Sequence, residues 1–186
     1  MGVAADFESC SVLKSGYKTS RRFFIDDNYT AHQAGMSMAG ALYFEDYTIG
    51  RIFESEPIGV TEEEIIQFAS RYDPQPFHVD KKAAEQSIYG GVIASGWHTA
   101  GLMMRRIAEC YLFPESSLGS PGLDELRWPS PVRPGDALRV VITVDDARLS
   151  RSRPDRGIVV SNMEARNQND QAVMSFRVTN FIRCRP

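Results

Sequence analysis

The chain has 186 residues, with 21 Lys and Arg against 24 Asp and Glu, so its formal net charge is −3, and 42% of its residues are hydrophobic. This length fits about one domain, and the apolar share suffices for a sizeable core, which excludes a disordered polyelectrolyte. The slight acidic excess argues against a nucleic-acid partner, because binding to phosphates needs a strong positive charge. No apolar stretch approaches the roughly 18–20 residues of a membrane helix, so no membrane partner is expected either.

The cysteines and the N-terminus point to the cytoplasm. Cys10, Cys110 and Cys184 lie far apart, without a C-x-x-C motif or a Cys/His cluster, so neither a disulfide framework nor a structural metal site is expected. The N-terminus has no apolar segment for secretion, and Asp6 stands where a myristoylation signal has Ser or Thr. We therefore expect a soluble protein of the reducing cytoplasm.

Residues 1–40 differ from the rest because they show no sustained hydrophobic period. Three interpretations stay open: a flexible or partly disordered leader, an artefact of the gene start with the natural start at Met36 or Met38, or an ordered arm that packs on a partner subunit. Residues 41–186 are expected to form the folded domain.

A capped helix is predicted after residue 60. Thr61 and Glu64 form a capping box ahead of apolar residues at helical spacing. Asp73-Pro74 ends this helix, because the residue before a proline avoids the α region.

Two more helices follow in the pattern. Residues 80–88 predict a short helix capped by Asp80. A longer helix runs from about 95 to 113, and its first half is small or apolar nearly all round, which is typical of a buried helix.

The second half of the chain alternates as strands do. Apolar residues recur with a period of two over 138–144, 158–163 and 172–182, and turn residues occupy 133–136 and 167–170. Helices followed by an antiparallel meander predict an α+β domain whose sheet wraps around a central helix.

The segment from Asp73 to His78 is the candidate for chemistry. A carboxylate and an imidazole stand five residues apart, and Pro74 and Pro76 are expected to exclude helix and hold the chain extended or turning. Both side chains could then point to one place, where they could move protons or activate water. A surface turn with a capping Asp73 and a structural His78 is the alternative.

Gly96 stands where the long helix begins. A helix N-terminus offers unpaired N–H groups, and glycine lets a ligand approach them closely, so Gly96 could hold a developing oxyanion. A glycine needed only for tight packing is the alternative.

Together these features resemble a known family. The string Asp73-Pro74-Gln75-Pro76-Phe77-His78, followed by Gly91-Val92-Ile93-Ala94-Ser95-Gly96, is similar to the MaoC-like dehydratases, also called (R)-specific enoyl-CoA hydratases. Their signature is D-x-N-P-x-H and a glycine at the start of the central helix. The resemblance covers about residues 43–183 and implies a hotdog fold, an antiparallel sheet around a long central helix, for a MaoC-like domain over 41–186.

The resemblance also implies a reaction. Asp73 and His78 would position and deprotonate a water that adds to C3 of a trans-2-enoyl thioester, or run the reverse dehydration, while the Gly96 N–H holds the thioester oxygen. It implies no metal or redox cofactor, a coenzyme A or pantetheine carrier, and a homodimer or higher homo-oligomer, with a place in fatty-acid metabolism.

Further residues are candidates for binding substrate. Gln75 replaces the family's Asn with the same amide on a longer side chain, which leaves substrate identity open. Ser95 could line the pocket or cap the helix, and Trp97 and Met104 could shape the acyl pocket or belong to the core. His98 could lie near the thioester or pack as a structural residue.

The role of an arginine cluster and two alternative functions stay undecided. The cluster could meet the phosphates of coenzyme A or a carrier protein, or be a solvated hairpin loop; it comprises Arg148, Arg151, Arg153 and Arg156. The alternative functions are a hotdog acyl-CoA thioesterase and a non-catalytic acyl-thioester-binding protein.

Overall fold

The computed structural model describes residues 40–186. Predictions that fall on residues 1–39, including the leader and the alternative start sites, lie outside the described residues. The elements in chain order are η1 (Phe44–Asp46), β1 (Ile52–Glu54), β2 (Ile58–Gly59), α2 (Glu62–Tyr72), α3 (Pro76–Val79), α4 (Lys81–Glu85), α5 (Gly96–Cys110), β3 (Leu123–Arg127), β4 (Ala137–Leu149), β5 (Arg156–Arg166) and β6 (Ala172–Arg183).

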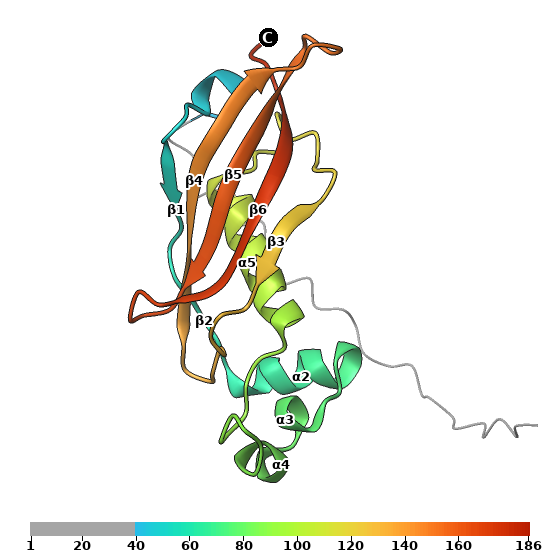
Figure 1. Ribbon diagram of the computed structural model, residues 1–186, viewed down its shortest axis with the longest axis vertical. Coiled ribbons are helices and arrows are strands. Elements are labelled where there is room, and N and C mark those ends of the chain that lie inside the picture. Colours follow the sequence, from blue (N-terminus) through green and yellow to red (C-terminus); the bar gives the residue numbers. More distant parts are fainter. Residues whose placement is uncertain (1–39) are drawn as a thin grey trace, which may run out of the picture. The chain divides into compact units, whose positions relative to one another are not determined.

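The strands form an antiparallel sheet in the order β1-β4-β5-β6-β3, and β2 pairs with the start of β4. The three long strands confirm the predicted meander (Figure 1). Along β4 every second residue from Leu138 to Val144 is buried, which is the period of a strand with one face on a core. The predicted hairpin turn after β5 is also confirmed, because the Asn167 N–H donates to the Gln171 carbonyl at 3.0 Å.

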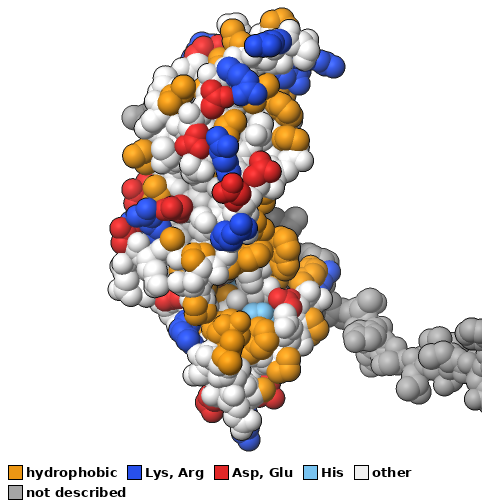
Figure 2. Space-filling model, viewed as in Figure 1, with side chains coloured by type: hydrophobic (Ala, Val, Ile, Leu, Met, Phe, Trp, Pro, Cys, Tyr) orange, Lys and Arg blue, Asp and Glu red, His pale blue; other side chains and the backbone are white. Residues whose placement is uncertain are grey.

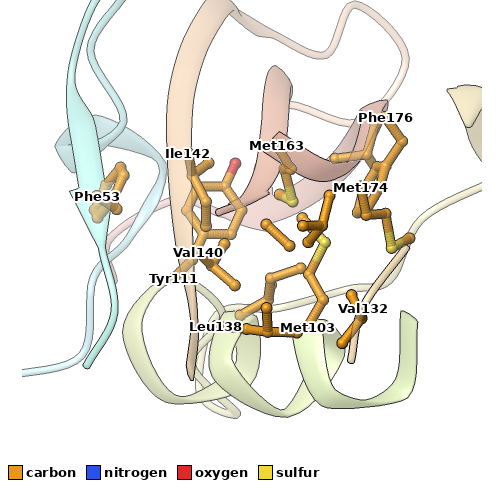
Figure 3. Close-up of a cluster of buried hydrophobic side chains, with 14 of the residues drawn as sticks. Phe53, Met103, Tyr111, Val132, Leu138, Val140, Ile142, Met163, Met174 and Phe176 are labelled. Carbon is orange, nitrogen blue, oxygen red and sulfur yellow. The ribbon is translucent and has the colours of Figure 1, made fainter. Parts of the chain in front are cut away.

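Helix α5 lies along the inner face of this sheet (Figure 1). Its buried Met103 packs in one cluster with Leu138, Met163 and Met174, which come from β4, β5 and β6 (Figure 3). Truncating one such methionine to alanine typically costs about 2–5 kcal/mol. The α+β arrangement predicted from the sequence is thus built around this helix.

Side-chain caps fix the ends of the helices that precede α5. The Thr61 hydroxyl accepts the Glu64 N–H at 3.2 Å, which confirms the capping box, and α2 ends at Tyr72 with Asp73 as its C-terminal cap. The Asp80 carboxylate accepts two N–H groups of the first turn of α4, at 2.9 and 3.2 Å, and so confirms the predicted cap of a helix that is shorter than expected.

The structure corrects the expectation that both prolines exclude helix. Pro76 is the first residue of α3, and His78 lies within that single turn. A proline fits this position, because the N–H that it lacks has no acceptor in the first turn of a helix.

The expectation that the apolar first half of α5 is buried is also wrong for the single chain. The sheet covers only one face of α5, so Trp97 is 60% exposed and Met104 is 48% exposed. Among the described residues, no helix has the length and apolar character needed to cross a membrane.

Candidate active site

A cavity of about 540 Å³ opens at the N-terminal end of α5. Three segments line it, within the ranges 73–78, 89–99 and 128–132. Figure 2 shows histidine and carboxylate surface close together and surrounded by hydrophobic side chains on this face of the molecule. Of the predicted site residues, the lining includes Asp73, Gln75, His78, Gly96 and Trp97.

Asp73 is held by hydrogen bonds to both of its carboxylate oxygens. The Ser95 hydroxyl donates to Oδ2 at 2.6 Å, and the Gln75 side-chain amide donates to Oδ1 at 2.9 Å. Because hydrogen bonds to the charged form favour it, the bond from Ser95 and then the bond from Gln75 lower the pKa of Asp73 below its ordinary value. Asp73 is therefore a fixed carboxylate at neutral pH.

His78 faces Asp73 from the turn of α3. The ring is buried, and its Nδ1 lies 2.7 Å from the Ile93 carbonyl oxygen. Because a carbonyl oxygen only accepts, Nδ1 carries the hydrogen in a neutral ring, and Nε2 is then an acceptor. Nε2 lies 3.4 Å from Asp73 Oδ2. Two acceptors at this spacing suit a water molecule, which has a hydrogen to donate to each of them.

Gly96 brings a free donor to the same cavity. It is the first residue of α5, where an N–H has no acceptor inside the helix, and none among residues 40–186 pairs with it. The Ser95 hydroxyl instead accepts the next N–H, that of Trp97, at 3.2 Å. The Gly96 N–H is thus available to an oxygen atom of a ligand.

The remaining predicted residues take different positions. Ser95 is fully buried and touches Asp73, whereas Trp97 lines the cavity. His98 and Met104 do not line it: the ring of His98 stacks on Phe68 at 5.0 Å, where burial lowers the pKa of His98, and Met104 is exposed further along α5. The arrangement therefore gives a substrate-binding role of His98 or Met104 no support.

The third lining segment, which begins at Trp128, is not among the site residues predicted from the sequence. The Trp128 indole N–H donates to the Gly96 carbonyl at 3.0 Å. The two residues are 32 positions apart, Gly96 in α5 and Trp128 in the connection after β3, so no local period joins them. The run Trp128-Pro129-Ser130-Pro131, rigid and aromatic ahead of a turn, is the signal that could have drawn attention to this wall.

The arginine cluster belongs to another region. Arg148 and Arg151 line a separate hollow of about 440 Å³ in the β4–β5 hairpin, and this hairpin lies at the opposite end of the sheet from α2–α4 (Figure 1). Arg148 pairs with Asp146, and Arg156 pairs with Asp155 at 2.8 Å. Within residues 40–186, no group of three or more His, Cys, Asp or Glu is placed to hold a metal ion.

Comparisons with known proteins show which proteins the chain is similar to. The sequence profile described as "MaoC like domain" matches residues 45–166. The crystal structure of the MaoC-like dehydratase from Rhodospirillum rubrum is 39% identical and covers 78% of this chain and 99% of its own, with a TM-score of 0.74. The protein YdeM of Bacillus subtilis is 26% identical over 139 residues, which are 75% of this chain and 97% of YdeM.

A third comparison concerns the fold alone. A Mycobacterium tuberculosis protein described as a double hotdog fold has a TM-score of 0.69 at 16% identity, over 79% of this chain and 46% of that one. The antiparallel sheet around α5 is accordingly a hotdog fold, as predicted. The profile match and the extent of the likeness show that the chain belongs to the family of MaoC-like domains.

Proposed function

We propose that this protein catalyses the reversible addition of water to a trans-2-enoyl thioester, which gives an (R)-3-hydroxyacyl thioester. The observation that carries the proposal is that the Asp73–His78 pair and the free Gly96 N–H line one cavity. Membership of the MaoC-like family, and the name of the Rhodospirillum rubrum relative as a dehydratase, support a hydratase or dehydratase.

The Asp73–His78 pair supplies the base. A water molecule donates one hydrogen to His78 Nε2 and the other to the Asp73 carboxylate, which orients its oxygen toward C3 of the enoyl group. His78 takes a proton as the new C–O bond forms, and the ionised Asp73 stabilises the imidazolium that results. In the reverse direction the 3-hydroxyl group donates its hydrogen to Asp73, and His78 Nε2 takes the proton from C2 and passes it to the hydroxyl group, which leaves as water.

Gly96 stabilises the charge that this attack creates. Electrons of the C2=C3 bond move toward the thioester carbonyl, and the Gly96 N–H donates to the oxygen where negative charge develops. When the carbonyl re-forms, C2 takes the proton from His78, so one water is added and His78 returns to its neutral form. The thioester itself acts as the electron sink, and we therefore propose no metal or redox cofactor.

The setting of the reaction belongs to the same proposal. We propose that the acyl group is carried on coenzyme A or on the pantetheine of a carrier protein, that the protein acts in fatty-acid metabolism in the cytoplasm, and that it works as a homo-oligomer. The exposed apolar residues near the cavity, Trp97 and Trp128, support an assembly that covers this face.

Paired assays test the proposed reaction. Crotonyl-CoA is offered to the full chain, the loss of its enoyl absorbance measures hydration, and a thiol reagent measures release of coenzyme A. We expect hydration without thiol release, and we expect Asp73→Asn and His78→Gln each to lower kcat/KM by at least ~10²-fold. Glu115→Gln, a neutralised carboxylate on the exposed turn after α5, is the control and should keep the wild-type rate.

Either of two results would overturn the proposal. Thiol release without hydration would make the protein a thioesterase, whose attack is on the carbonyl carbon. Full hydration by both Asp73→Asn and His78→Gln would remove the pair from the mechanism.

A further inference from the structure

The cavity has two walls joined by a strip of backbone. The Ile93 N–H donates to the Phe77 carbonyl at 3.3 Å, and the neighbouring Ala94 N–H donates to the Val132 carbonyl at 2.8 Å. Successive amides thus bind the segment of His78 on one side and the segment of Trp128 on the other. The strip from Ile93 to Gly96 therefore lies between the acid–base pair and Trp128.

Trp128 is a fixed wall rather than a loose surface side chain. Besides the hydrogen bond to the Gly96 carbonyl, its ring lies so close to Gly96 that a Cβ atom there would come within 2.7 Å of it. Its ring also meets Trp97 edge-on, with centroids 5.6 Å apart. Pro129 and Pro131 restrict the backbone that follows.

We propose that Trp128 is a specificity-determining residue that limits the acyl group to a flat shape. This inference rests on the proposed function. In a 2-enoyl thioester the carbonyl and the C2=C3 bond are conjugated, so these atoms are coplanar. Trp128 lines the same cavity as His78 and is hydrogen-bonded to Gly96. In the proposed complex the Gly96 N–H holds the oxygen, His78 approaches one face of this plane, and the other face stacks on the Trp128 indole.

The Trp128 ring restricts how thick an accepted acyl group can be more than how long it can be. A crotonyl or cinnamoyl group stays flat beyond C3, whereas a quaternary C4 places methyl groups above and below the plane. One of these methyl groups would meet the indole ring, which the contacts with Gly96 and Trp97 hold in place. The site should therefore accept flat acyl groups and reject those with a quaternary C4.

Charge narrows the substrate class further. Neither lysine nor arginine lines this cavity in the described part of the chain, and the pKa of Asp73 is lowered, so Asp73 is negative at neutral pH. A second carboxylate on the acyl group would meet repulsion from Asp73 and find no cation among the lining residues of 40–186. The substrate class is thus a flat, uncharged 2-enoyl thioester.

A series of side chains at position 128 tests the wall. The full chain and its Trp128→Phe, Trp128→Leu and Trp128→Ala variants are assayed with crotonyl-CoA and 4,4-dimethylpent-2-enoyl-CoA. We expect the ratio of kcat/KM for the branched over the flat substrate to rise as the side chain shrinks, by at least about 10-fold in Trp128→Ala. Trp128→Phe, which keeps an aromatic wall but loses the hydrogen bond, should stay near wild type. Leu149→Ala, at an exposed leucine of the distant hairpin, is the control.

Tryptophan fluorescence in the His78→Gln background, where hydration is slowed, gives a second readout that measures binding without turnover. The chain has two tryptophans, and both line this cavity, so in each variant Trp97 remains to report binding. We expect the ratio of dissociation constants for the two thioesters to shift in the same order as the kinetic ratio. Because binding is measured separately from hydration, the wall is tested even if the protein fails to hydrate either compound.

The two proposals fail in distinguishable ways. If crotonyl-CoA binds but is not hydrated, the proposed function is wrong. If hydration proceeds while both ratios in Trp128→Leu and Trp128→Ala equal those of wild type, Trp128 does not determine specificity and the proposed function stands. Preference of the wild type for an enoyl thioester with a second carboxylate would overturn the charge argument.

Discussion

At the scale of single residues, the hold on Asp73 can be tested directly. Ser95 and Gln75 each donate to one carboxylate oxygen, and Ser95 makes the larger contribution to the lowered pKa of Asp73. We expect Ser95→Ala to raise the pKa of Asp73 toward its ordinary value, and Gln75→Ala to raise it less. Carboxyl carbon NMR titration of Asp73 measures both shifts. An equal shift in both variants, or none, would contradict the assignment of these two donors.

The same pKa sets how acid affects folding. A carboxylate whose pKa is lowered in the folded state contributes stability above its ordinary pKa, and this contribution is lost as the pH falls through the lowered value. Ser95→Ala should therefore lower the free energy of unfolding most near neutral pH. At low pH the free energies of unfolding of the variant and the wild type should lie closer together, which urea unfolding at several pH values would show. A deficit that does not depend on pH would mean that Ser95 acts through packing alone.

At the scale of elements, the start of α2 depends on one hydroxyl group. Thr61 accepts the Glu64 N–H and so satisfies one of the helix's unpaired donors. We expect Thr61→Ala to lower the free energy of unfolding by about 1 kcal/mol, measured by urea denaturation, whereas Thr61→Ser keeps the cap and most of the stability. Equal losses in the two variants would show that the methyl group, not the hydroxyl, matters.

Contact between η1 and β5 requires a glycine. A Cβ atom at Gly157 would lie 1.8 Å from the Phe44 ring, so Gly157→Ala should displace the ring and cost about 1–3 kcal/mol of unfolding free energy. In the Phe44→Ala background the added methyl should cost much less, because the obstacle is gone. Gly59→Ala is the matched strand control, since nothing lies within 4 Å of a Cβ there. Additive losses in the double variant would refute the contact.

The elements whose residues repeat with a local period could be predicted from the sequence. The contacts between residues far apart in the chain could not. The alternation of buried and less buried residues along β4 and the capping box at Thr61 each depend only on residues close together in the sequence. The contact of Ser95 with Asp73 joins residues 22 positions apart, and the Trp128 wall lies further still from its partner Gly96. Such contacts depend on how whole elements pack, which no local pattern encodes.

At the scale of the whole molecule, the site combines parts from the end of α2, from α3, from the start of α5 and from the connection between β3 and β4. The C-terminal cap of α2 supplies Asp73, the turn of α3 supplies His78, and the start of α5 supplies Gly96. The connection between β3 and β4 closes the other side with Trp128. Because α5 is anchored on the sheet by residues such as Met103, the core fixes where its N-terminal N–H groups point.

The apolar surface that is exposed on the single chain leads us to expect an assembly of two or more chains. Strand β3 is an edge of the sheet with an exposed Leu123, and the outer face of α5 exposes Trp97 and Met104. An edge strand beside exposed apolar side chains is a surface that soluble proteins usually cover. We expect sedimentation equilibrium to give at least twice the mass of one chain, and Leu123→Asp to shift the protein toward the monomer.

The control for this surface is another exposed leucine of the same sheet. Leu149 lies at the end of β4, next to the β4–β5 hairpin, and is 58% exposed, against 49% for Leu123, so Leu149→Asp introduces the same charge at a similarly open position. The Leu149→Asp variant should have the same mass in solution as the wild type, because a charge outside the interface stays exposed to solvent when the chains associate. Equal dissociation by both variants would place the interface elsewhere. A wild-type mass of one chain at every concentration would mean that the exposed face of α5 needs no second copy.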